Sequence, residues 1–104
     1  MARPPIVVVN AAELRQMFQQ QDCLGRLQRG ELVERLLKDR IPAPPPRGMP
    51  PGTRSQIIAY IDRNGVQVAV VHQYRLPNGT LGASGLPDPK RLLFDGLLHI
   101  VVEP

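Results

Sequence analysis

The sequence predicts an α+β fold in which an N-terminal helical hairpin precedes an antiparallel β-sheet of about four strands. Apolar residues recur at helical spacing before residue 42 and alternate with polar residues after residue 53. Residues 42–52 contain six prolines, which favour a stiff polyproline II segment. We therefore expect a helical hairpin over residues 1–41, a proline-rich connector over 42–52 and a β unit over 53–104. The two ends would either pack separately or share one core.

The first helix of the hairpin is predicted over about residues 11–20. A short extended segment, Ile6–Val9, precedes it. Asn10 is a suitable N-cap residue, and Glu13 follows three residues later as in a capping box. The apolar side chains that follow repeat every three or four residues, which is typical of a helix with one buried face.

A loop is predicted over residues 22–30, because this segment contains Gly25 and Gly30. A second helix is predicted over about 29–39, with an apolar stripe at helical spacing and Lys38 in its last turn. Pro42 would end it.

Two hairpins are predicted after the connector. Alternating residues form strands on either side of Asn64-Gly65, a pair of residues typical of a tight hairpin turn. A second hairpin is predicted around Asp95-Gly96, after a loop rich in glycine and proline over residues 82–89.

Composition excludes several classes of protein. A single cysteine, Cys23, cannot form an internal disulfide, and with only His72 and His99 in addition it cannot complete a structural zinc site. The 104 residues contain no apolar run near the roughly 20 needed to span a membrane, and the start is too weakly apolar for a signal peptide. The net charge is +4. We expect a small cytoplasmic protein with no cofactor, no bound metal and no membrane association.

Residues 10–37 resemble the SAP domain, a DNA-binding helix–loop–helix motif. The resemblance lies in Ala12-Glu13-Leu14-Arg15 and in Glu31-Leu32-Val33-Glu34-Arg35-Leu36-Leu37, with a spacing of 18 residues from Leu14 to Leu32. It covers about a third of the chain, and it departs from the family pattern at Asp22 and Leu27, where the family commonly has glycine. The resemblance implies that the hairpin binds nucleic acid, with DNA as the expected ligand.

The expected phosphate contacts lie where the loop enters the second helix. Arg26, Gln28 and Arg29 would stand at a helix N-terminus, whose free N–H groups attract phosphate. Arg15 and Lys38 would extend this basic patch. The leading hypothesis is a small non-enzymatic nucleic-acid-binding protein.

Two other classes of function remain open at this stage. The apolar strands with few charges favour a homo-oligomer or a subunit of a larger assembly. Alternatively, His72, Tyr74, Arg75 and Lys90 supply the residue types that small metal-independent ribonucleases of the toxin kind use for proton transfer and phosphate binding.

Overall fold

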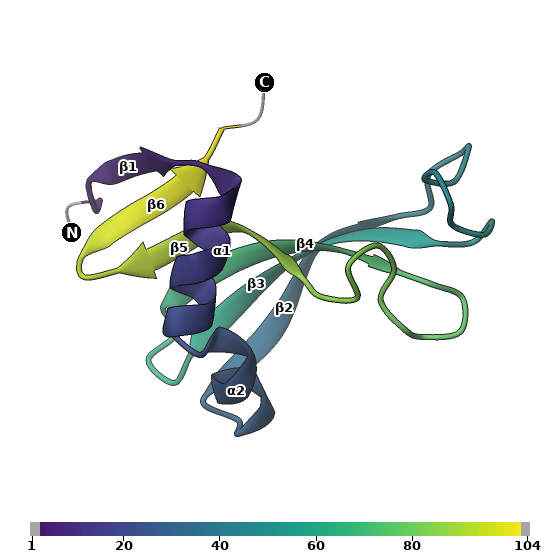
Figure 1. Ribbon diagram of the computed structural model, residues 1–104. Helices are drawn as coiled ribbons and strands as arrows, with labels where there is room; N and C mark the ends of the chain where they lie inside the picture. The colour runs from purple at the N-terminus through teal and green to yellow at the C-terminus, as the bar shows by residue number, and fades with distance from the viewer. Residues whose placement is uncertain (1–2, 103–104) are drawn as a thin grey trace.

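The computed structural model describes residues 3–102, which form a six-stranded mixed sheet and two short helices (Figure 1). In chain order the elements are β1 (Ile6–Val9), α1 (Ala11–Gln20), α2 (Cys23–Gln28), β2 (Leu32–Arg40), β3 (Arg54–Asp62), β4 (Gln67–Arg75), β5 (Asp88–Phe94) and β6 (Leu97–Val101).

The strands lie in the order β1-β6-β5-β4-β3-β2. From β2 to β6 each strand pairs antiparallel with the next one along the chain. β1 pairs parallel with β6, so two strands from opposite ends of the described residues lie side by side. β1 and β2 are therefore the two edges of the sheet.

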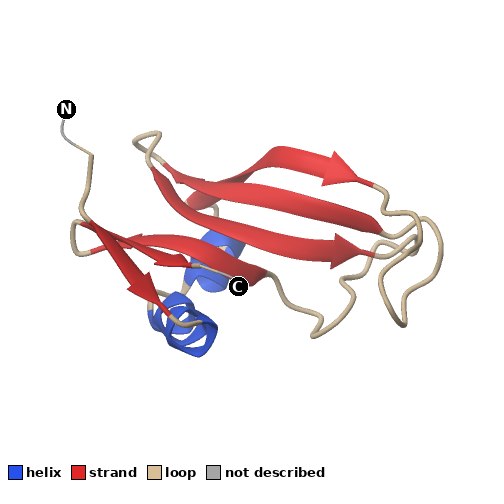
Figure 2. Ribbon diagram, turned by 90° about the horizontal axis from the view of Figure 1, so that it is seen from above, coloured by secondary structure: helices blue, strands red, loops and turns tan. Residues whose placement is uncertain are grey.

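Both helices lie against one face of the sheet (Figure 2). Leu14 and Phe18 of α1 and Cys23 of α2 are buried against apolar residues of the central strands. The Phe18 and Tyr60 rings lie 6.0 Å apart in this core. We call this side the helix face. The buried strand residues on it are Leu32, Ile58, Tyr60, Ala69, Val71 and Leu92.

The opposite side, which we call the helix-free face, has a smaller apolar cluster. Ala59, Ile61 and Val70 are buried there, with Ile57 packed beside them, and the cluster includes no helix residue. Side chains of successive strand residues point to opposite faces, so Ile57, Ala59 and Ile61 alternate with Ile58 and Tyr60 of the main core. The sheet is thus covered on one face only.

Several predicted elements are confirmed. The segment Ile6–Val9 is extended and the first helix spans Ala11–Gln20, as predicted. The Asn10 side chain accepts a hydrogen bond from the Glu13 backbone N–H at 2.8 Å, which satisfies one free donor of the first turn. The hairpins at residues 63–66 and 95–96 are also present, with Gly65 at φ 80° in the first turn.

The predicted fold class is wrong, because residues 29–39 form no second helix. Instead, a six-residue helix, α2, occupies the predicted loop, and Leu32–Arg40 form the edge strand β2. Gly30 follows α2 with φ 78°, a conformation that ends the helix and that favours glycine. β2 then pairs with β3 along nearly its whole length. The sheet consequently has six strands rather than about four, and no helical hairpin stands apart from it.

The proline-rich connection joins β2 to β3 at one end of the sheet, beside the loop between β4 and β5 (Figure 2). Thr53 at its end is fully buried and its hydroxyl donates to the Pro50 carbonyl at 2.7 Å. Gly82 of the neighbouring loop lies so close to Met49 that an added Cβ would stand 3.1 Å from the Met49 sulfur. The connection is therefore packed against the β4–β5 loop.

Candidate functional site

A row of basic side chains crosses the helix-free face. Residues directly opposite each other on paired strands share a face, so strand register assigns the side of each side chain. Arg35 is opposite Ala59 and Arg91 is opposite Val70, and both of these partners belong to the helix-free cluster. Arg35 and Arg91 therefore project on the helix-free face, from β2 and β5 respectively.

Two irregularities in the sheet bring further cations to the same side. Lys38 is opposite Ile57 after a register shift in β2, and Arg40 is opposite Ser55 two residues along β3. In β5 the register shifts between Pro89 and Arg91. Lys90 is the extra residue at this irregularity. Both Lys90 and Arg91 line a groove with Val70.

The acidic residues of the edge strand β2 point to the other face. Glu34 is opposite Tyr60 and Asp39 is opposite Gln56, which places both carboxylates on the helix face. Asp39 is also paired there with Arg54 at 3.2 Å. The helix-free face is therefore strongly basic between β2 and β5.

Asp88 lines the same groove as Lys90 and Arg91, and its carboxylate is held in two ion pairs. Its carboxylate oxygens lie 3.1 Å from Arg15 of α1 and 3.1 Å from Lys90. Burial raises the pKa of the Asp88 carboxyl, but hydrogen bonds from Lys90 and Arg15 outweigh burial and hold its pKa below the usual range. Asp88 stays ionised at neutral pH and orients Lys90.

His72 and Tyr74 lie in the middle of the basic row. Both are on β4 and alternate with the buried Val71 and Gln73 of the helix face. Their rings meet edge to face with centroids 4.7 Å apart. The His72 Nε2 atom also forms a 2.8 Å hydrogen bond with the Ser55 hydroxyl, which fixes the ring on the sheet.

Two hollows meet at these rings. A groove of about 770 Å³ runs over the helix-free face, and its lining includes Leu37, Ile57, His72, Tyr74, Lys90 and Arg91. A second hollow of about 480 Å³ opens toward the helix face between α1 and the β4–β5 loop, and its lining includes Phe18, Leu24, His72, Tyr74, Ser84 and Leu86. His72 and Tyr74 are accessible from both hollows.

The arginines predicted from the sequence to bind phosphate lie on the other side of the molecule. Arg26 is in the last turn of α2 and Arg29 is its C-cap, so both stand at the negative end of the helix dipole rather than at a helix N-terminus. Arg29 forms ion pairs with Asp22 at 3.1 Å and with Glu31 at 2.6 Å. Arg26 lies 4.0 Å from Glu31. These ion pairs leave little free positive charge at this end.

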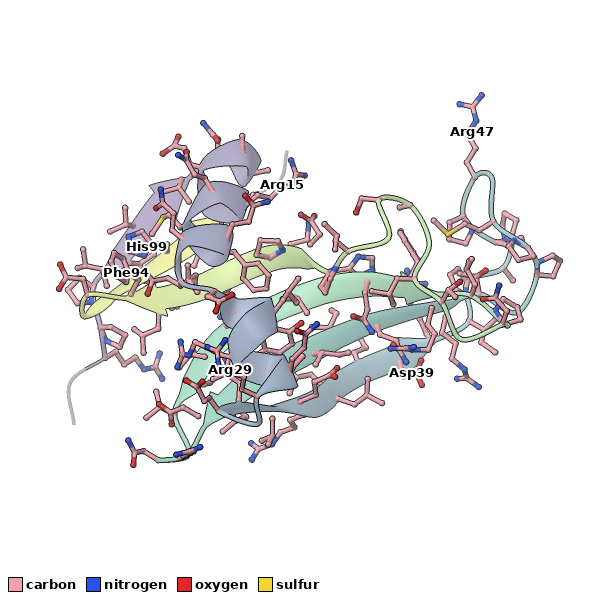
Figure 3. All side chains as sticks on the ribbon, turned by 60° about the horizontal axis from the view of Figure 1, so that its bottom comes forward. Arg15, Arg29, Asp39, Arg47, Phe94 and His99 are labelled. Atoms are coloured by element: carbon pink, nitrogen blue, oxygen red, sulfur yellow. The ribbon has the colours of Figure 1, made fainter. Side chains whose placement is uncertain are left out.

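The predicted nucleic-acid-binding set is not brought together. Arg15 is on α1 and Arg29 is beside α2, both on the helix side (Figure 3). Gln28 is exposed at the end of α2. Of this set only Lys38 joins the row on the helix-free face.

The residues of the ribonuclease hypothesis are partly assembled. His72, Tyr74 and Lys90 line the same groove. Arg75 does not join them, because its side chain hydrogen-bonds the Gly79 carbonyl at 2.7 Å and Gln56 at 3.4 Å. Sequence reasoning missed Arg35, Arg40 and Ser55. Arg35 and Arg40 are five residues apart, so simple alternation would place them on opposite faces. The register shift between Leu36 and Lys38 brings them to one side, and it depends on β2 being a strand paired with β3.

Within residues 3–102 no group of three or more histidine, cysteine, aspartate or glutamate side chains is arranged to hold a metal ion. The same residues contain no helix that is both long and apolar enough to traverse a bilayer.

No protein-family model matches the chain, and comparison with the curated proteins and with the solved structures found no match.

Proposed function

We propose that the protein binds single-stranded nucleic acid along its helix-free face. The observation that carries this proposal is the row formed by Arg35, Lys38, Arg40, Lys90 and Arg91. The carboxylate in the groove, Asp88, is shared between Arg15 and Lys90. A polyanion is the ligand that such a row attracts, because each cation that meets a phosphate releases a condensed counterion.

The aromatic rings in the row favour a single strand over a duplex. His72 and Tyr74 are half-buried on the same face as the cations, and an unstacked base can pack against such rings. Bases inside a duplex are already stacked and present only their edges. One strand would then bind at two kinds of contact, its phosphates at the cations and one of its bases at the rings.

The direct test is fluorescence anisotropy with a labelled 2′-O-methyl RNA 12-mer, as a single strand and as a duplex with its complement. We expect the single strand to bind more tightly and the binding to weaken as salt rises. Absence of binding at low salt, or equal affinity for the duplex, would contradict the proposal.

A second candidate function is self-association through the edge strand β2. Two observations support it. The side chains of Val33, Leu36 and Leu37 are 58%, 53% and 49% exposed. They lie on a nine-residue strand whose outer backbone edge has no ladder partner among the described residues. A long apolar edge strand is a ready site for pairing with another strand. A second copy of the chain, related by a two-fold axis, would satisfy both edges at once.

Light scattering coupled to size-exclusion chromatography tests self-association. The wild-type protein should elute as a dimer and Leu36→Lys as a monomer, since Leu36 is exposed in the single chain. Ile41→Lys is the matched control, because Ile41 is equally exposed, at 53%, but lies beyond the end of β2. A monomeric wild-type protein would dismiss this candidate.

A further inference from the structure

We propose that the groove around His72 cleaves single-stranded RNA by transesterification. The phosphoryl group is transferred from the 5′-oxygen of the next nucleotide to the neighbouring ribose 2′-hydroxyl. This inference rests on the proposed nucleic-acid binding and assigns that surface a chemical activity. Its basis is that an imidazole, an ammonium group and a guanidinium line the same groove of the basic face. These are the groups that an attack on a phosphate diester requires.

The imidazole is held in place by its neighbours on the sheet. Ser55, on β3, fixes the ring through the 2.8 Å bond to Nε2, and Tyr74 supports the ring by the edge-to-face contact. Imidazole is the side chain whose ordinary pKa lies closest to neutrality, which suits it to accept and return a proton. His72 is the proton acceptor in this scheme and Ser55 is a positioning residue.

The cations lie on the other side of the groove. Asp88, opposite His72 in the ladder, holds the Lys90 ammonium at 3.1 Å, and Arg91 follows Lys90 on the same side of β5. A phosphate placed between β4 and β5 would therefore meet the imidazole from one strand and two cations from the next. Negative charge that builds up on the phosphate oxygens during attack would be stabilised by Lys90 and Arg91.

The reaction balances without a further reactant. The ribose 2′-oxygen forms a bond to phosphorus while its proton passes to the imidazole of His72. The bond from phosphorus to the 5′-oxygen of the next nucleotide breaks, and that oxygen takes a proton from the Lys90 ammonium. The products are a 2′,3′-cyclic phosphate and a free 5′-hydroxyl. The imidazolium afterwards returns its proton to Lys90 through water.

The neighbouring hollow gives the adjoining base a place. It reaches the same two rings from the side of α1, and apolar side chains such as Phe18, Leu24 and Leu86 line much of it. Its volume of about 480 Å³ is large enough for a nucleobase. A base lodged there would anchor the strand beside the reacting phosphate.

The test uses one 5′-labelled 12-mer in two chemical forms, unmodified RNA and fully 2′-O-methylated RNA. The methylated strand lacks the attacking hydroxyl proton, so it reports binding alone. We expect both strands to bind and only the unmodified RNA to shorten, with cyclic-phosphate termini identified by mass spectrometry. If the protein binds both strands and cleaves neither, the cleavage inference is overturned and the binding proposal stands. If neither strand binds, both fall.

Variants assign the activity to the groove. His72→Gln should slow the cleavage of bound RNA, measured at saturating protein, at least about 100-fold, the lower end for loss of a positioned acid–base group. Saturation separates this loss from any weaker binding, because His72 also lies in the proposed binding surface. Lys90→Gln is a second variant with the same expected loss of cleavage. His99→Gln is the matched control, because His99 lies away from the groove, with its Nδ1 atom 3.3 Å from the Leu92 carbonyl. Cleavage that persists in His72→Gln, or that disappears equally in His99→Gln, would overturn the inference.

Discussion

The charge row on the helix-free face makes a quantitative prediction about salt dependence. Arg35 and Arg91 project from opposite borders of the row, and neither forms an ion pair within the described part of the chain. Both are exposed, so Arg35→Gln/Arg91→Gln should leave the fold intact. The double variant removes two of the five cations and nothing from the apolar core.

The magnitude follows from counterion release. If each of the five cations meets one phosphate, the logarithm of the association constant should fall with the logarithm of the salt concentration at a slope of about −3.5. Each phosphate contact on a single strand contributes roughly −0.7 to this slope. Between about 50 and 200 mM salt, the wild-type affinity should then fall roughly 100-fold. The double variant, with three contacts, should have a slope of about −2.1 and lose only about 20-fold over the same range.

The assay is a salt series of anisotropy titrations with the 2′-O-methyl strand. The matched control is Arg26→Gln/Arg29→Gln, which removes the same charge from the end of α2. Those arginines are paired with Asp22 and Glu31, so the control should retain the wild-type slope. A wild-type slope in Arg35→Gln/Arg91→Gln, or a flattened slope in the control alone, would refute binding on the helix-free face.

Three further predictions concern stability and reactivity. Leu14→Ala should lower the free energy of unfolding by about 2–5 kcal/mol in urea titrations because Leu14 is fully buried. Leu36 is exposed, so Leu36→Ala should lower the free energy of unfolding by under about 0.5 kcal/mol. Equal losses in the Leu14 and Leu36 variants would contradict the packing of α1. The folded-state pKa of Asp88 is depressed, so its stabilisation is full above the unfolded pKa of about 3.9 and is lost as pH falls through the lower folded value. Asp88→Asn should therefore lower the free energy of unfolding at pH 7. It should also reduce the amount by which the free energy of unfolding falls between about pH 7 and pH 2. If that fall is the same in the variant, the Asp88 ion pairs do not contribute to the pH dependence of stability. Cys23 is 1% exposed and burial raises the pKa of its thiol, so a thiol-specific reagent should label it slowly until urea unfolds the chain. Rapid labelling of the native protein would show that α2 opens readily.

The elements predicted correctly are those defined by local chemistry. The Asn10 cap and the Asn64-Gly65 turn depend on a few adjacent residues, and both are present. β2 was missed because leucine, glutamate, arginine and lysine all have high helix propensity and its apolar residues also fit helical spacing. Pairing with β3, which is distant in sequence, determines its conformation instead. Propensity is a weak preference that such tertiary contacts override.

The candidate site was only partly predictable for a related reason. The alternation of His72 and Tyr74 along one strand was visible in the sequence, so their common side could be predicted. Their placement beside Lys90 depends on which strands are neighbours and on the register shift in β5. Assignment of Arg35 to the same surface requires β2 to be a strand. Long-range register, rather than local pattern, assembles this surface.

The parallel pairing of β1 with β6 affects how the chain is completed during synthesis. Ile6–Val9 are synthesised before Leu97–Val101, and their ladder partners form only after that later strand has followed. Contacts so far apart in sequence form late, because the intervening loop must close before the hydrogen bonds are gained. Until then, the backbone N–H and C=O groups of Ile6–Val9 lack the hydrogen-bond partners that β6 supplies, so an incomplete chain exposes an open strand edge at this segment.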